Sequence, residues 1–173
     1  MTAVHAALAA AMCMSAVPIG FAARASADEP CDPGALAVTK SPLQPGMGHR
    51  AVQLDFTLQS GACQLTGYPT VDAEPQVEGA APIHAAQTPS GYLGGAVAGG
   101  TVTLTPGHGA HAMLEWIGSA PVPDCSTYAR PSTDVSLSVT PPGMSQTFTV
   151  PIAVGRNEGL CRLQVHPLTG DRT

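Results

Sequence analysis

The chain has 173 residues, 12 Asp and Glu against 7 Lys and Arg, and a formal net charge of −5. Its few basic residues form no cluster, so it lacks the positive surface that nucleic acids and anionic membranes require, and we expect neither as a partner. The 19 glycines and 17 prolines follow no fixed period, which excludes a collagen-like repeat and indicates short strands separated by turns.

The first segment, residues 6–23, is almost wholly apolar and small. It is marginal in length for a membrane span, and Pro18 and Gly20 would interrupt a helix there. The sequence Ala25-Ser26-Ala27 then supplies the small residues that signal peptidase requires. We therefore expect residues 1–27 to be a secretory signal peptide that is cleaved after Ala27.

The mature part, residues 28–173, is then a single domain that is secreted or associated with the cell envelope. No later segment reaches 18 consecutive apolar residues, so no membrane span is expected after signal cleavage. A retained anchor or a buried core helix is the alternative for the first segment, because the five residues that precede it contain no Lys or Arg.

Four cysteines remain after the predicted signal peptide: Cys31, Cys63, Cys125 and Cys161. An even number of cysteines in an exported chain predicts two disulfides. None of them forms a C-x-x-C pair, so neither a zinc ribbon nor a thioredoxin-like redox centre is indicated. Of the three possible connectivities we favour Cys31–Cys63 and Cys125–Cys161, which pair neighbours in sequence. Each would contribute about 3–4 kcal/mol in the loop-entropy account.

Apolar and polar residues alternate in many segments of the mature chain, as in half-buried antiparallel strands. In residues 51–58, Val52, Leu54 and Phe56 share one face. In residues 111–117, one face carries Ala112, Leu114 and Trp116, and the other carries His111, Met113 and Glu115. Further strands are predicted over 101–105, 134–140, 146–152 and 161–167, with less regular patterns at 36–40, 63–66 and 70–77.

These patterns predict an all-β fold, an immunoglobulin-like antiparallel β-sandwich of about 7–9 strands with two disulfides. No mature segment has a helical stripe. Trp116, the one tryptophan, is expected to anchor the core, and an exposed binding aromatic is the alternative.

Residues 78–100 interrupt the strand pattern and are rich in Gly and Ala. A segment of this length is either a functional loop or a plain or disordered connection. Tyr92 is its one side chain suited to recognition, so it is our candidate binding residue. Because sandwiches commonly present ligands on end loops, the candidate loops are 41–49, 78–100 and 117–131.

Three motifs occur in a fixed order along the chain: C-x-L-x-G-Y-P (63–69), P-G-x-x-A-H-A (106–112) and C-x-L-x-V-x-P (161–167). In this combination the chain resembles a family of actinobacterial exported proteins described as domain of unknown function 4232. The resemblance covers residues 31–168. It implies an exported or envelope domain with disulfides, and it implies no activity.

His108 and His111 are the candidate metal ligands, with Glu115 as a third ligand four residues beyond His111. A site also needs a ligand set held in place by neighbouring groups, and sequence alone cannot place His49, His84 and His166 around it. The alternative is that these histidines face solvent or form ordinary hydrogen bonds.

No catalytic residues are assigned. The chain has no Gly-x-Ser-x-Gly turn for a serine hydrolase, no phosphate-binding glycine loop ending in Lys-Ser or Lys-Thr, and a single lysine, Lys40. We therefore expect a non-catalytic exported protein without a cofactor that binds an envelope or extracellular component. The alternatives are a divalent metal-binding protein and a small extracellular hydrolase.

Overall fold

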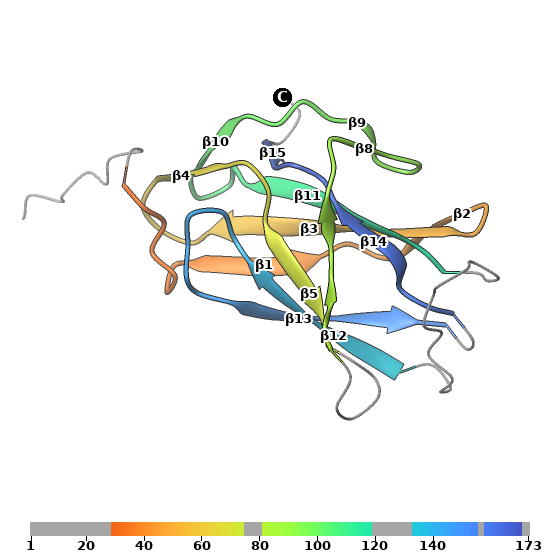
Figure 1. Ribbon diagram of the computed structural model, residues 1–173. Helices are drawn as coiled ribbons and strands as arrows, with labels where there is room; N and C mark the ends of the chain where they lie inside the picture. The colour runs from red at the N-terminus through yellow and green to blue at the C-terminus, as the bar shows by residue number, and fades with distance from the viewer. Residues whose placement is uncertain (1–28, 75–80, 119–132, 156–157, 171–173) are drawn as a thin grey trace, which may run out of the picture.

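A computed structural model describes residues 29–74, 81–118, 133–155 and 158–170 of the chain (Figure 1). These residues form strands and no helix, so the predicted all-β class is confirmed for this part of the chain. The strands are β1 (Leu36–Lys40), β2 (Gln44–Gly46), β3 (His49–Leu58), β4 (Cys63–Thr66), β5 (Thr70–Ala73), β6 (Ile83–His84), β7 (Ala86–Gln87), β8 (Ser90–Gly91), β9 (Gly95–Ala96), β10 (Thr101–Leu104), β11 (Ala110–Ile117), β12 (Thr133–Thr140), β13 (Phe148–Val154), β14 (Cys161–Val165) and β15 (Thr169–Gly170).

Two larger sheets organise these strands. The first has the order β1-β3-β11-β14-β7, with β2 paired to β3 and β15 paired to β11. The second has the order β13-β12-β5-β6, and the pairs β10–β4 and β8–β9 form two small ribbons. Every pairing is antiparallel except that of β14 with β7.

A single apolar core receives side chains from both larger sheets. Val52, Leu54 and Phe56 of β3 are fully buried, and they pack in one cluster with β12 residues such as Leu137. Trp116 is 1% exposed, so its predicted place in the core is confirmed. Burial of each large apolar side chain stabilises the fold by about 1.5–3 kcal/mol. A strand in which apolar and polar residues alternate therefore turns its apolar face toward the core.

The nine segments predicted as strands correspond to β1, β3, β4, β5, β10, β11, β12, β13 and β14, each four residues or longer. Their ends differ from the predicted ends by a few residues. The remaining six strands have two or three residues each, too short for an alternating pattern to be read in the sequence. The finer immunoglobulin-like assignment stays a prediction.

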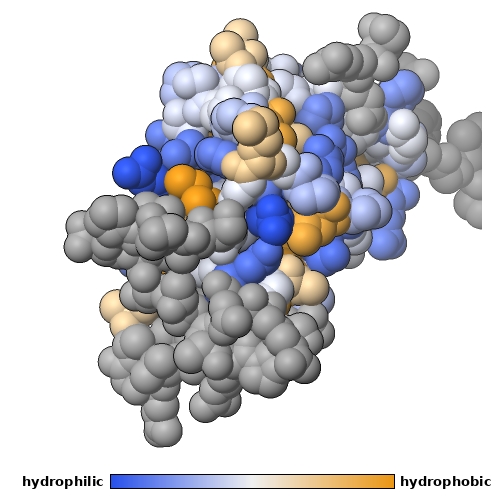
Figure 2. All heavy atoms as spheres, turned by 90° about the vertical axis from the view of Figure 1, so that its right-hand side faces the viewer, coloured by the Kyte–Doolittle hydropathy of each residue, from blue (hydrophilic) through white to orange (hydrophobic). Residues whose placement is uncertain are grey.

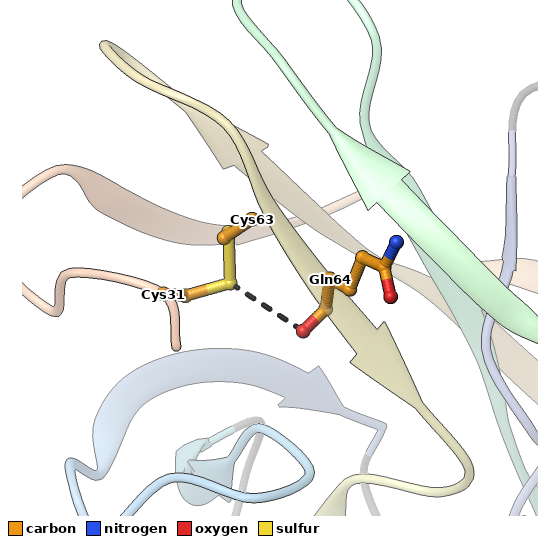
Figure 3. The surroundings of a disulfide bond; sticks show 3 residues. All are labelled: Cys31, Cys63 and Gln64. Atoms are coloured by element: carbon orange, nitrogen blue, oxygen red, sulfur yellow. Dashed lines mark hydrogen bonds between the residues drawn. A yellow bond between two sulfur atoms is a disulfide. The ribbon is translucent and has the colours of Figure 1, made fainter. Parts of the chain in front are cut away.

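Cys31 and Cys63 form the first predicted disulfide, with their Cα atoms 5.0 Å apart (Figure 3). It attaches the segment before β1 to the start of β4. The Sγ of Cys31 also lies 3.9 Å from the backbone oxygen of Gln64. This is a contact and not a hydrogen bond, because a disulfide sulfur carries no proton.

The second predicted disulfide is only half described. Cys161, the first residue of β14, is buried and does not carry a free thiol. Cys125 lies outside the described residues, so its pairing with Cys161 stays a prediction. The predicted signal peptide, residues 1–27, also lies outside them. Within the described ranges, no helical segment has the length and apolarity needed to cross a bilayer.

Residues 81–100 hold most of the segment that interrupts the sequence pattern, and β6 joins the second sheet whereas the part from β7 onward packs against the first. Gln87 of β7 pairs with Val165 of β14, and the Thr88 amide donates to the Val165 carbonyl. Figure 1 shows β8 to β10 along β11, on the side away from β12 and β13. The segment therefore covers part of the outer face of the first sheet. Residues 78–80 of the predicted loop lie outside the described residues.

Candidate functional site

Glu115 is a buried carboxylate on the outer face of β11. Its neighbours Leu114 and Trp116 point into the core, so alternation directs Glu115 outward, as predicted. Although it lies on the outer face, its side chain is only 4% exposed. The segment between β8 and β9, residues 92–94, covers it.

Four hydrogen-bond donors surround the Glu115 carboxylate. Oε1 accepts from the backbone N–H of Tyr92 at 2.8 Å and from Nδ1 of His49 at 3.0 Å. Oε2 accepts from the backbone N–H groups of Leu93 at 2.8 Å and Gly94 at 3.2 Å. A carboxylate therefore fixes three consecutive amides of one loop and the side chain of another strand.

The pKa of Glu115 reflects two opposing effects. Burial alone raises it, but the hydrogen bonds from Leu93, Gly94, Tyr92 and His49 together outweigh burial and lower the pKa below its usual value. Glu115 is therefore ionised at neutral pH. Since an ionised carboxylate can only accept, Nδ1 of His49 carries a proton in this contact.

Two glycines allow the loop to lie this close to the sheet. A Cβ atom at Gly91 would be 2.6 Å from both Glu115 Oε2 and His166 Nε2, and one at Gly94 would be 2.6 Å from His166 Cε1. Real Cβ atoms do not approach other atoms so closely. Close packing thus explains Gly91 and Gly94, whereas a Cβ at Gly95 would meet nothing within 4 Å and Gly95 adopts a positive φ of 64°.

His166 lies beneath the same loop. It follows β14, its backbone N–H donates to the Met113 carbonyl, and its side chain is 1% exposed. Its Nε2 is 4.0 Å from Glu115 Oε2, and neither ring nitrogen has a hydrogen-bond partner among the described residues. Burial lowers the pKa of His166, and the opposing effect of the Glu115 charge is smaller. His166 is therefore neutral at neutral pH.

Tyr92 connects the loop to the β2–β3 hairpin. Its ring stacks on the His49 ring, with centroids 4.3 Å apart and an interplanar angle of 17°. Its hydroxyl donates to the Sδ of Met47 at 3.1 Å. Met47 is 89% exposed and Tyr92 is 54% exposed. The predicted candidate Tyr92 is thus exposed, and it lies among partners that the sequence pattern did not identify.

Met47 occupies a left-handed backbone conformation with φ 43° in the turn between β2 and β3. For a non-glycine residue this costs about 1–2 kcal/mol. The next residue, Gly48, has φ 87°. Strained residues often occur at functional sites, so the strain at Met47 makes this turn a candidate part of the functional site.

We use the term Met47–Tyr92 surface for the side chains of Leu43, Met47, His49 and Tyr92. Leu43 directly precedes β2 and is 39% exposed. A Cβ at Gly46 would be 2.7 Å from Leu93 Cδ2, which shows how closely the hairpin and the loop pack. Figure 2 shows the end of the molecule toward which the β2–β3 turn projects in Figure 1, where hydrophobic atoms lie between hydrophilic ones.

The predicted metal ligands lie in different surroundings. His108 lines a cavity of about 220 Å³ with Asp55, whereas His111 lines one of about 420 Å³ with Met113 and His166. The Glu115 carboxylate is occupied by its four donors. No three or more His, Cys, Asp or Glu side chains in the described ranges are arranged to hold a metal ion, so His108, His111 and Glu115 do not form such a group.

The other two histidines considered in the sequence are also placed. His84 of β6 pairs through Nδ1 with Asp72 of β5, and its side chain is 75% exposed. His49 begins β3 and contacts Glu115. The glycines on both sides of Tyr92 and the Met47-Gly48-His49 turn are the sequence signals for this site, but neither signal identifies its partner.

Most of the chain matches one known family. Residues 31–169 match the family described as "Domain of unknown function (DUF4232)". The chain belongs to this family. The match spans the DUF4232 domain from the Cys31–Cys63 disulfide to β15, and includes Met47, Tyr92 and Glu115. No curated protein and no solved structure gives a significant match.

Proposed function

We propose that this DUF4232 protein is an exported, non-catalytic binding module that recognises a polypeptide of the cell envelope or the extracellular medium through the Met47–Tyr92 surface. Its two sheets around one core are compatible with the immunoglobulin-like sandwich that we propose as its scaffold. The Cys31–Cys63 disulfide supports export, because structural disulfides persist in oxidising compartments.

The proposal rests on the positions of the exposed apolar side chains. Within the described residues, the large hydrophobic side chains that are exposed are Leu43, Met47 and Tyr92. Leu43 and Met47 flank β2, and Tyr92 touches Met47. Met47 and Tyr92 come from two segments far apart in the sequence and meet beside the first sheet, and Leu43 lies at the other end of β2.

The surface is also held in place before any partner arrives. Glu115 fixes the backbone on both sides of the Tyr92 side chain, and the Tyr92 ring is stacked on His49. An ordered loop loses less conformational entropy on binding than a mobile one. The buried carboxylate therefore serves recognition by fixing Tyr92 in one position.

The chemistry of the surface favours a polypeptide with an apolar side chain as the partner. Tyr and Met are enriched in protein–protein interfaces, and Met adapts its shape to the side chain that it meets. The surface contains no Lys or Arg. The nearby Arg50 is paired with Glu158, so its charge is already neutralised.

The test is site-specific photo-crosslinking in cells that export the protein. A photoreactive amino acid at Leu43 lies at the rim of the surface and leaves Met47 and Tyr92 intact, and one at the exposed Gln146, before β13, is the control. We expect a discrete crosslinked protein from position 43 only, lost when Tyr92→Ala or Met47→Ala is added. The same product from both positions, or a product that persists in both variants, would refute the proposal.

A further inference from the structure

His49 has the environment of a metal-ligating histidine. Its Nδ1–H donates to a carboxylate, which fixes the orientation of the ring. That carboxylate, Glu115, is itself held by three backbone amides, so it does not compete as a ligand. The Nδ1 atom is taken up by buried Glu115 and the side chain is 26% exposed, so Nε2 is the ring nitrogen left for a ligand.

A second donor lies two residues earlier in the chain. Met47 presents its thioether at a turn in which the side chain is 89% exposed and the backbone is strained. Exposing an apolar side chain through a strained conformation is unfavourable on both counts, so folding alone does not account for it. Tyr92 contacts both residues, with its ring on His49 and its hydroxyl on Met47 Sδ.

We propose that Met47 Sδ and His49 Nε2 bind one Cu(I) ion. Thioether sulfur is a soft donor that selects Cu(I), and imidazole also binds copper well. Tyr92 contacts both donors, and the Met side chain has three rotatable bonds that let its sulfur adjust to a metal. The Tyr92 hydroxyl uses one lone pair of the sulfur and leaves the other for the metal.

The charge of the site suits a cation. The carboxyl group of Glu115 lies directly behind His49, and the net charge of the whole chain is −5. Arg50, the neighbouring cation, is neutralised by Glu158. A thioether and an imidazole also suit an oxidising compartment, since cysteines there form disulfides.

The test is competition for Cu(I) against a colorimetric chelator, under anaerobic conditions with ascorbate, using the exported protein with its disulfides intact. We expect one Cu(I) per chain, with affinity lowered at least about tenfold by Met47→Leu and by His49→Gln. The matched controls are Met144→Leu, at a partly buried methionine near the start of β13, and His84→Gln, at the exposed His–Asp pair. Both should leave the affinity unchanged.

Copper binding and polypeptide recognition can be tested separately. Met47→Leu keeps an apolar side chain of similar volume, so it should weaken copper binding at least about tenfold and preserve the crosslink from position 43. Circular dichroism confirms that each variant is folded. The absence of saturable Cu(I) binding, or equal affinity in Met47→Leu, His49→Gln and both controls, would overturn the copper site.

Discussion

The carboxylate of Glu115 and the imidazole of His49 join two neighbouring strands of the first sheet on its outer face, with 3.0 Å between Oε1 and Nδ1. The same carboxylate holds the loop that carries Tyr92, and Tyr92 stacks on His49. Strand, loop and hairpin turn are therefore fixed relative to one another by one buried charge. Substitutions in Glu115, in the loop glycines, in His166 and in the disulfide should therefore have separable effects.

Replacing Glu115 by Gln should destabilise the domain by about 2–3 kcal/mol, because hydrogen bonds to a charged group are strong and one amide NH₂ would face backbone donors. Urea unfolding followed by Trp116 fluorescence measures the loss. Glu74→Gln is the control, since Glu74 is exposed and should change little. Equal stability of the two variants would show that Glu115 does not hold the loop.

Adding a methyl group at Gly91 or Gly94 should force the loop away from the sheet. The new Cβ would lie 2.6 Å from His166 in either case, and the strain is expected to cost about 1–3 kcal/mol. Gly100→Ala is the matched control, because a Cβ there meets nothing within 4 Å. If all three alanine variants melt at the same temperature, the close packing of this loop is refuted.

Stability should fall as the solution becomes mildly acidic because of His166. Its folded pKa is lowered by burial, so between the usual imidazole value of about 6.5 and the lowered value the unfolded chain binds more protons than the folded one. This contribution to stability is complete above pH 6.5 and is lost as the pH falls through that window.

The check is the pH dependence of the free energy of unfolding in the wild type and in His166→Gln. The groups around His166 are Glu115 of β11, the uncharged backbone of Gly91 and Gly94, and His111 of β11, which lines the same cavity. We expect a shallower slope below pH 6.5 in the variant. Identical slopes would mean that His166 keeps its ordinary pKa in the folded protein.

Removing the Cys31–Cys63 disulfide with paired serine substitutions should lower stability by about 3–4 kcal/mol, since the crosslink restricts the unfolded chain between the two cysteines. Unfolding in urea measures this loss. The Met47–Tyr92 surface contacts neither cysteine, so copper binding by the folded fraction should persist. A negligible change in stability would contradict the role of this crosslink.

The sequence predicted the elements that depend on local pattern. Alternation placed Phe56 and Trp116 in the core and Glu115 on the outer face, and the order of the cysteines suggested the Cys31–Cys63 pair. It could not predict that Glu115 is buried. The covering loop lies about 20 residues earlier in the chain, and its approach depends on a sheet formed by segments distant in sequence.

The candidate site shows the same limit. Tyr92 could be singled out because glycines surround it and few other aromatics exist in the chain. Its partners could not, since His49 and Met47 reach it through the turn of a separate hairpin. His108 and His111 attracted attention through their spacing, yet they line different cavities. Spacing along a strand does not determine what the loops of a β-fold bring together.

The central claim is that ionised Glu115 holds the loop that presents Tyr92. Amide hydrogen exchange at neutral pH, read by NMR at Tyr92, Leu93 and Gly94, tests it most directly. We predict that these three amides are protected in the wild type and exchange freely in Glu115→Ala, while the β3 amides remain protected in both. Rapid exchange of the three amides in the wild type would contradict it.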